Sequence, residues 1–373
     1  MSSKISSFHR KCKKLFKTPG VFFRDYFNKK YPDVYNEILC PQDEESILIQ
    51  HDISLENQMN INFPIDVVFT WVNDKDPEWQ RKYQFYCHID PHRHGKYATD
   101  QARFSNHNEL YYAIKSVVIN LPWVRQIFVV TDNQLPPWLD EYPNVKVIDH
   151  TQIISHKYLP TFNSHVIEAH LHNIPSLAEH FIYFNDDVFV ARPLPAGHFF
   201  KGNGLASIFL SRKSLVRMHG KGIVTPTLSA SMNVREIINN DFSLSIDIPL
   251  VHTYVPLRKS VFDFIWQNYE ENIAGFLVNK FRTNSDLNMA TFMVPWFTYI
   301  KGLATPERDI CHYFNVRSVS AKKNYSLLTK IKHEGGGPHS FCANDFTTTK
   351  SEFQDYQLAL LSMLDFFYEK GKY

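Results

Sequence analysis

Short apolar runs followed by polar residues recur through the first two hundred residues of the chain. Runs rich in β-branched and aromatic residues, typical of buried strands, occupy residues 65–72, 126–131, 145–148 and 181–184. Apolar residues at helical spacing predict helices over 106–120 and 163–180. Strands that alternate with helices favour an α/β fold with a mostly parallel central sheet flanked by helices.

The second half of the chain has a different pattern. Residues 257–281, 286–301 and 351–370 are predicted to be helical, whereas 204–250 shows no decisive pattern. We therefore expect a helical C-terminal part after the sheet.

Charge is unevenly distributed along a chain whose formal net charge is only +2. Residues 1–30 hold nine Lys or Arg and one acid, a net charge of +8, which leaves −6 on the rest. We expect a basic, aromatic-rich arm over 1–32 and a linker over 33–62. The arm is predicted to contact an anionic membrane, or alternatively to pack on the body of the protein. Nucleic acid is not an expected partner.

Composition indicates a folded body over residues 63–373. Hydrophobic residues make up 44% of the 373 residues and charged residues 21%, which excludes a disordered or coiled-coil chain. Five cysteines without a CxxC pair predict neither a zinc site nor a disulfide framework. No apolar run approaches the ~18 residues of a membrane span, and no secretory signal is recognised. These features predict a cytoplasmic protein, peripheral on the inner face of the membrane.

Polar residues follow three of the predicted strands, and ligands bind beyond the carboxyl ends of parallel strands. Asp186 and Asp187 follow one strand and suit Mg²⁺ (or Mn²⁺), which takes oxygen ligands; the alternative is an exposed acidic pair in a turn. Trp71, Asn73 and Asp74 end another strand and suit a nucleotide through stacking and amide hydrogen bonds. The alternative for Trp71 is a buried side chain that caps the strand.

His252 and Arg282 lie 30 residues apart, with Asp286 close behind. Phosphoryl chemistry uses an arginine to hold developing negative charge and a histidine to move a proton. The chain has 18 histidines, so from the residues alone a surface or satisfied core histidine is the favoured reading of His252.

Four blocks of sequence occur in a fixed order along the chain. The first is Ile65–Asn73, and the second runs from Arg103-Phe104 through Asn108-Glu109-Leu110, Val130–Gln134 and Leu159–His165 to Val188. The third is His252–Arg258 with Phe281-Arg282 and Asp286, and the fourth is Phe341–Asp345 with the closing helix. These blocks resemble, in order, those of the Stealth family of hexose-1-phosphate transferases. Ala343 and Asn133 depart from the family pattern, and 204–250 matches nothing in it.

The resemblance implies a GT-A/Rossmann-like fold with a nucleotide- and metal-binding half over 65–203 and a half over 204–373 that bears the catalytic His and Arg. It implies transfer of a hexose-1-phosphate from a UDP-sugar donor to a capsule oligosaccharide acceptor, with UMP released and a phosphodiester formed. The implied metal ligands are Asp186 and Asp187. The implied catalytic residues are His252 as base, Arg282 as phosphoryl clamp, and Asp286 and Asp345 as orienting or metal-site acids. The implied substrate-binding residues are Trp71, Asn73, Asp74, Arg103, Asn108, Asp132, Asn163 and Asn185.

Two alternatives belong to other classes. A metal-dependent GT-A-like glycosyltransferase would bind the same donor but release UDP. A polysaccharide-binding or assembly protein without activity would not need the histidine, the arginine and the acidic pair together. The sequence does not identify the sugar, the acceptor, the linkage position or the oligomeric state.

Overall fold

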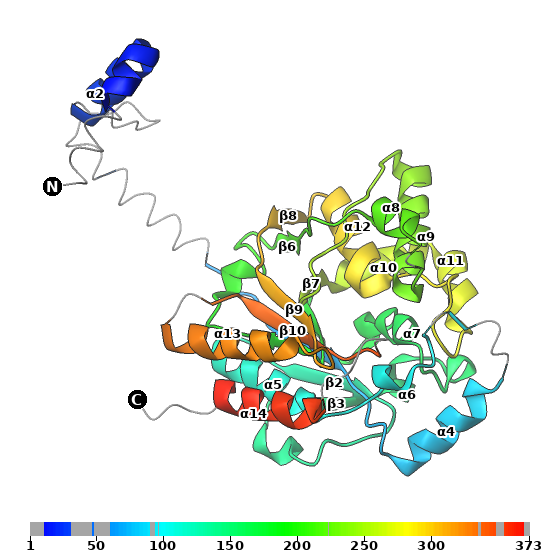
Figure 1. Cartoon of the computed structure of the whole chain (residues 1–373). Coiled ribbons are helices and arrows are strands. Elements are labelled where there is room, and N and C mark those ends of the chain that lie inside the picture. The colour runs from blue at the N-terminus through cyan, green and yellow to red at the C-terminus, as the bar shows by residue number, and fades with distance from the viewer. Residues whose placement is uncertain are drawn as a thin grey trace. The chain divides into compact units, whose positions relative to one another are not determined.

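The computed structural model describes residues 11–30, 47, 60–89, 94–95, 97–222, 224–334, 337–347 and 354–368 (Figure 1). The chain divides into two units, residues 1–58 and 59–373, and each is described by itself. Most of the predicted linker over 33–62 lies outside the described residues. The division of the body into two functional halves stays a prediction.

The described part of the first unit is helical over 11–17 and in α2 (Pro19–Lys30), with Thr18 between the two segments. Aromatic rings one turn apart stack in α2, with Phe23 and Phe27 centroids 6.4 Å apart. Phe16 is 85% exposed and Phe27 52% exposed, so both helical segments carry exposed apolar rings.

The second unit holds the sheets and most helices. Its strands are β1 (Ile65–Thr70), β2 (Ile127–Thr131), β3 (Val145–Asp149), β4 (His180–Asn185), β5 (Val188–Val190), β6 (Ala206–Phe209), β7 (Val255–Arg258), β8 (Ala304–Glu307), β9 (Cys311–Asn315) and β10 (Ser340–Asn344). Its α-helices are α4 (Pro77–Cys87), α5 (Glu109–Asn120), α6 (His150–Ile153), α7 (Ser164–Glu168), α8 (Leu215–Gly220), α9 (Pro226–Phe242), α10 (Lys259–Asn268), α11 (Glu270–Leu277), α12 (Val294–Ile300), α13 (Ala321–Glu334) and α14 (Tyr356–Tyr368). Within the described residues, no helix is both long and apolar enough to span a bilayer.

The central sheet has the strand order β3-β2-β1-β4-β7. The first four strands are parallel, with Val68 of β1 opposite Phe128 of β2 on one side and Tyr183 of β4 on the other. Only β7 at the edge runs antiparallel. The predicted mostly parallel sheet is confirmed. Smaller sheets pair β5-β10-β9 and β6-β8.

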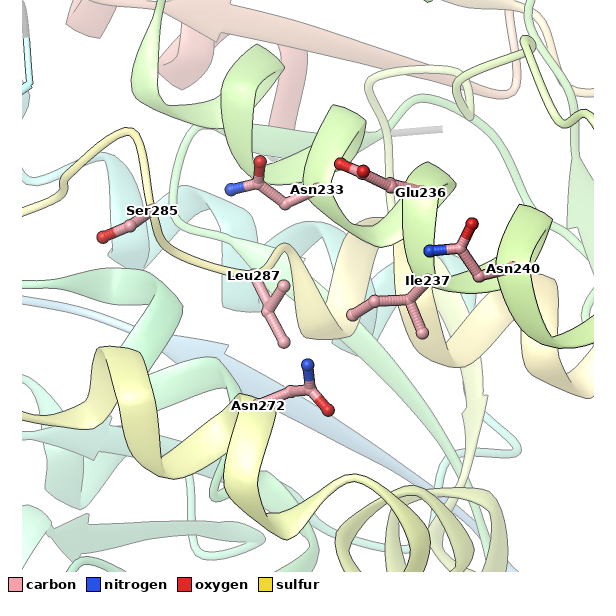
Figure 2. A pocket seen from close by; sticks show the side chains of 7 residues that line it. All are labelled: Asn233, Glu236, Ile237, Asn240, Asn272, Ser285 and Leu287. Carbon is pink, nitrogen blue, oxygen red and sulfur yellow. The ribbon is translucent and has the colours of Figure 1, made fainter.

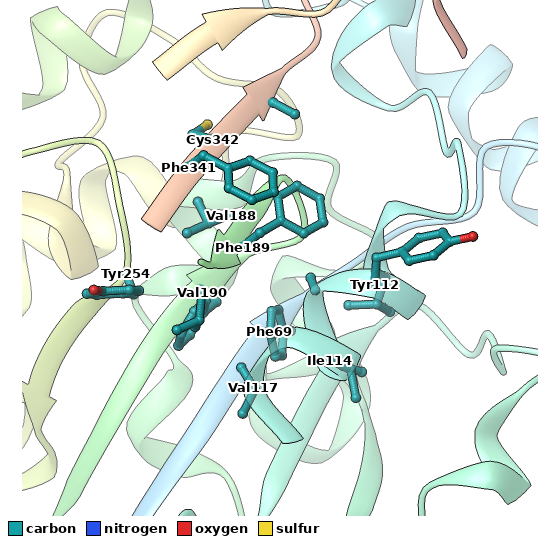
Figure 3. Packing of buried hydrophobic residues seen from close by; sticks show 14 of the residues in the cluster. Phe69, Tyr112, Ile114, Val117, Val188, Phe189, Val190, Tyr254, Phe341 and Cys342 are labelled. Atoms are coloured by element: carbon teal, nitrogen blue, oxygen red, sulfur yellow. The ribbon is translucent and has the colours of Figure 1, made fainter. Parts of the chain in front are cut away.

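Both faces of the central sheet are covered, which explains why its strands are continuous apolar runs rather than alternating ones. Successive side chains of β1 point to opposite faces, so Val67 and Phe69 join one hydrophobic cluster and Val68 the other. The first cluster includes α5, α14 and the β5–β10 pair, and Figure 3 shows Phe189 and Phe341 packed in it. The second includes α9, α10, α11 and α12.

Several predicted helices need correction. The long helix expected over 163–180 is wrong, because only α7 and the 3₁₀ turn Leu171–Asn173 are helical there. Pro175 and the positive φ of Ser176 (63°) end any helix before β4. Over 257–281 the chain first completes β7 and then forms two helices, α10 and α11. In 286–301 a π-helical turn, Met289–Met293, precedes α12. The undecided stretch 204–250 contains β6, α8 and α9.

The strand order reverses beside β1. From β1 the chain proceeds outward through β2 and β3 and then returns to place β4 on the other side of β1. Ligands of open α/β sheets bind at this kind of reversal, beyond the carboxyl ends of the strands. Here those ends are the residues after Thr70 and after Asn185.

Candidate active site

Asp186 and Asp187 occupy the turn between β4 and β5, where the chain leaves the central sheet for the smaller one. The antiparallel pairing of β5 with β10 sets Val188 opposite Cys342, which brings Asp187 beside β10. Asp187 Oδ2 accepts hydrogen bonds from Asn344 Nδ2 (2.8 Å) and Cys342 Sγ (3.3 Å). Its Oδ1 is buried without any hydrogen-bond partner in the described part of the chain. A buried carboxylate oxygen without a donor fits a metal ligand.

His252 lies next to this carboxylate. Ligand atoms of Asp187, His252 and Cys342 all lie within 4.8 Å of one another. The His252 residue is exposed, yet the protein atoms packed around its ring lower its pKa by desolvation; the Asp187 charge opposes this, and Lys213 and Arg282 add to it. A neutral imidazole, open to solvent beside an acidic group, is able to accept a proton.

Carboxylates crowd this end of the sheet. Burial, and then the charge of Asp187, raise the pKa of Asp186 to about 7. Glu109, at the start of α5, has a pKa raised well above its ordinary value by burial and by the charges of Asp186 and Asp187. The Glu109 carboxylate accepts a hydrogen bond from the backbone N–H of His107. Mutual repulsion among these acids is the cost that a bound cation would remove.

Two guanidinium groups form a positive counterpart. The charge of Arg282, followed by desolvation, lowers the pKa of Arg103 to about 9, so the two cations lie close together. Arg282 donates to neutral hydroxyls: Nε to Ser164 Oγ (3.1 Å) and Nη1 to Thr227 Oγ1 (3.0 Å). Within the described residues, neither arginine has a carboxylate partner. The charges of Asp100 and Glu168 act on Arg103 without a direct ion pair among the described residues. Neighbouring guanidinium groups that make no ion pair suit a phosphate or pyrophosphate.

Asp286 holds the loop that carries Arg282. Its fully buried carboxylate accepts from Asn163 Nδ2 (2.8 Å), Asn279 Nδ2 (2.9 Å), and the backbone N–H (3.0 Å) and hydroxyl (2.7 Å) of Thr283. It also pairs with His165 Nδ1 at 3.0 Å. Despite its desolvation, these hydrogen bonds keep the pKa of Asp286 below its ordinary value.

These contacts bear on two predicted roles. The amide of Asn163 is buried and engaged with the Asp286 loop, so contact with substrate requires rearrangement of that loop. For Asp286, the geometry favours the role of orienting Arg282 over the role of metal ligand. Both roles stay predictions.

The residues after β1 are held by neighbouring loops. Gln134 and the backbone of Asn73 exchange two hydrogen bonds of 2.7 and 2.9 Å. Asp74 Oδ1 accepts from the backbone N–H of Asn106 (3.0 Å). Trp71 is buried, and its indole N–H has no partner in the part of the chain that the structure describes. This burial fits the alternative reading of Trp71 as a buried side chain that caps the strand.

The remaining predicted site residues have varied surroundings. Asn108 precedes α5 with a left-handed φ of 66°, and its Oδ1 accepts from the Trp138 indole N–H (3.3 Å). Asn185, at the end of β4, accepts from the Tyr183 hydroxyl (3.0 Å). Asp132 forms an ion pair with Lys82 at 2.8 Å, and so is already neutralised by a protein cation.

Asp345 lies away from the group formed by Asp187, His252 and Cys342. It pairs with His107 Nε2 at 2.8 Å and with the Arg317 guanidinium. Hydrogen bonds from these partners keep the pKa of Asp345 below its ordinary value despite desolvation. The pair of Asp345 with His107 joins the end of β10 to the loop before α5. Glu109 is the first residue of α5. An orienting role fits this geometry better than a metal-binding one, and it stays a prediction.

Sequence comparison identifies the family. Residues 63–87 match Stealth protein CR1, conserved region 1, and residues 103–208 match Stealth protein CR2, conserved region 2. Capsular polysaccharide phosphotransferase LcbA of Aeromonas hydrophila is 61% identical over 340 residues, which cover 91% of this chain and 94% of that protein. The protein of the same name from Neisseria meningitidis is 54% identical over 96% of this chain and 99% of its own length. The chain belongs to the Stealth family.

The Stealth matches confirm the first two of the four predicted blocks; the assignment of the third and fourth stays a prediction. The chain is also similar to a solved structure of galactosyltransferase LgtC, with a TM-score of 0.41, 10% identity, and coverage of 80% of this chain and 95% of that one.

Sequence reasoning did not select Glu109, Cys342 or Asn344 of this Stealth chain as site residues. All three lie inside the sequence blocks that resemble the family, and this position was a partial signal that they belong to the site. Cys342 and Asn344 are two residues apart on β10 and therefore point to the same face, toward Asp187. Their partner could be found only once β10 was paired with β5.

Proposed function

We propose that this Stealth protein moves a hexose-1-phosphate from a UDP-sugar to a hydroxyl of a growing capsule glycan, releasing UMP and forming a phosphodiester. One observation carries the proposal. Asp187, next to Asp186, lies within 4.8 Å of the exposed imidazole of His252, and the charge of Arg282 acts on both that imidazole and Arg103. The names of the similar capsular polysaccharide phosphotransferases support the reaction class.

The chemistry assigned to each group follows from charge and position. The His252 imidazole takes the proton of the acceptor hydroxyl as its oxygen bonds to the β-phosphorus of the donor. The bond from that phosphorus to the bridging oxygen breaks, and UMP leaves with the electron pair. Arg282, with Arg103 beside it, holds the phosphoryl oxygens as their charge develops. The sugar C1–O bond stays intact, so the anomeric configuration is retained.

Asp186 and Asp187 are the residues proposed to hold Mg²⁺ or Mn²⁺. The buried, unpartnered Oδ1 of Asp187 and the raised pKa of Asp186 both fit a bound cation. When bound, such an ion neutralises pyrophosphate charge and orients the donor. Trp71, Asn73 and Asp74 are proposed to face the uridine.

Phosphorus NMR tests the reaction directly. Purified protein is incubated with Mg²⁺, a panel of UDP-sugars and capsule oligosaccharides. The oligosaccharides are prepared from the capsule of a bacterial strain that encodes this protein. UMP together with a phosphodiester resonance in the glycan is the expected result. Release of UDP without a phosphodiester would instead show a glycosyltransferase.

His252→Ala is expected to lower kcat by at least ~10²-fold, the usual contribution of positioned proton transfer. Donor affinity should change little, because the imidazole serves the acceptor. Steady-state kinetics and calorimetric titration of the UDP-sugar measure the two quantities. His156→Ala, at an exposed histidine, is the matched control. Near-normal turnover of His252→Ala would show that His252 is not the general base. The next candidate is buried His165, whose Nε2 has no hydrogen-bond partner among the described residues.

The arm is proposed to bind anionic membrane from the cytoplasmic side. Exposed rings such as Phe16 and Phe27 lie on the same short helical segments as the cations. Full-length protein should co-sediment with phosphatidylglycerol vesicles, and added salt should weaken this binding by screening.

Reversal of three exposed arm charges should abolish that sedimentation and leave turnover on soluble acceptor unchanged; the residues changed to Glu are Lys11, Lys13 and Lys17. The control makes the same change in charge on the body, at Lys146, Lys221 and Lys323. Equal sedimentation of the two variants would contradict a membrane role for the arm.

A further inference from the structure

A cavity of about 410 Å³ opens between α9, α11 and the loop that follows Arg282 (Figure 2). Its size lies in the range of small-molecule sites, roughly 300–1,000 Å³. One wall comes from the stretch 204–250, to which the family resemblance assigns no function. None of the residues discussed above as catalytic or metal-binding lines it.

The lining combines groups that suit a sugar ring. Asn240 and Glu236 of α9 and Asn272 of α11 are exposed and offer amide and carboxylate groups to hydroxyls. Ile237 and Leu287 supply an aliphatic base for the C–H face of a sugar. Figure 2 shows these side chains around one open space. Amides that both donate and accept match hydroxyl groups, which do the same.

One helix face connects the cavity to the proposed transfer site. Residues 233, 236, 237 and 240 follow the i, i+3, i+4, i+7 spacing and so share one face of α9. Near the start of the same helix, Thr227 accepts from Arg282 Nη1 (3.0 Å). Asn233 Nδ2 donates to the backbone carbonyls of Asn284 and Asp286, both at 2.9 Å. The cavity wall is therefore bonded to the loop that presents Arg282.

The spacing of residues along α9 gives the distance between the cavity and Thr227, which contacts Arg282. At 1.5 Å per residue, the α9 residues that line the cavity lie ~9 to 20 Å along the helix from Thr227. A donor sugar bound at Arg282 does not extend over that length while also occupying the nucleotide side. An extended glycan chain does span that length, because several of its sugar residues are held while its end reacts.

We propose that this cavity binds the acceptor glycan at sugar residues remote from the reacting hydroxyl. The inference rests on the proposed function. Glu236 faces the cavity, so the segment bound there is a neutral sugar rather than a phosphodiester, whose charge the carboxylate would repel. Binding of remote residues supplies energy that holds the reacting end in place.

Asn240→Trp, which fills the cavity, tests the inference against Asn239→Trp. Asn239 is equally exposed, adjacent on α9 and absent from the cavity lining. The substrates are capsule oligosaccharides of one and of four or more repeating units, with saturating UDP-sugar. Asn240→Trp should raise KM for the long acceptor about tenfold, an effect of one or two lost hydrogen bonds. The kcat, the donor KM and the kinetics with the short acceptor should match those of Asn239→Trp.

Asn240→Ala should raise the same KM by a smaller factor, which separates lost contacts from a bulky intrusion. Equal long-acceptor KM values in the Asn240 and Asn239 variants would overturn the inference. Saturation-transfer NMR of the long oligosaccharide, without donor, tests glycan binding in the cavity separately from the proposed transfer reaction. Binding lost only in Asn240→Trp keeps the cavity assignment even if no UMP is ever formed. Formation of UMP with unchanged binding rejects the cavity and keeps the reaction.

Discussion

Asp187→Asn is expected to lower turnover by at least about 10³-fold, as several kcal/mol of charge stabilisation are lost at ~1.4 kcal/mol per tenfold. The substitution keeps the volume of the side chain and an oxygen that accepts from Asn344, so the turn between β4 and β5 should stay folded. What disappears is the negative charge of a carboxylate whose Oδ1 has no hydrogen-bond partner among the described residues. The thermal unfolding midpoint should therefore change little while turnover collapses.

The measurement pairs activity with metal binding. Titration of Mn²⁺, followed by electron paramagnetic resonance, should show a site in the wild type that Asp187→Asn weakens strongly. Asp263→Asn, at an exposed acid on α10, is the matched control and should behave as wild type. Full activity of Asp187→Asn in EDTA would eliminate the metal role.

Arg282→Lys is expected to lower kcat by at least ~10²-fold although the charge is kept. The guanidinium is fixed by Ser164 and Thr227, which directs its planar fork, whereas a lysine ammonium is a point donor that reaches neither in the same geometry. The contact strengthens as charge develops on the phosphoryl oxygens, so the loss should fall on kcat more than on donor affinity.

Arg217→Lys, at an exposed position on α8, is the control for this variant. Thr227→Val removes only one hydrogen bond to the guanidinium and should cost less, about tenfold. A tenfold or greater loss of donor binding by Arg282→Lys with kcat retained would assign Arg282 to ground-state binding of the donor instead.

Local sequence was sufficient for the central architecture. The four parallel strands are continuous apolar runs because both of their faces are buried, and this pattern is visible without any tertiary information. Asn73, Asp74 and Asp186 could be recognised as candidate site residues for the same reason: polar groups directly after buried strands gather at one edge of a parallel sheet. The helical prediction between Asn163 and β4 was wrong because the apolar residues there belong to a short helix, a 3₁₀ turn and the segment after it. All of these segments contribute residues to the second hydrophobic cluster without forming one helix face.

Tertiary structure alone decided which polar groups meet. Asp187 and Cys342 are 155 residues apart, and the antiparallel register of β5 and β10 makes them neighbours. The Asp286 carboxylate anchors the loop that carries Arg282 to Asn163, just before α7, and the charge of Arg282 there acts on Arg103, 179 residues earlier in the chain. Sequence determined the strands and the chemistry available at their ends, since burial and period are local properties. Register and long-range packing determined the partners, because one strand pairing fixes many distant contacts that no local pattern encodes.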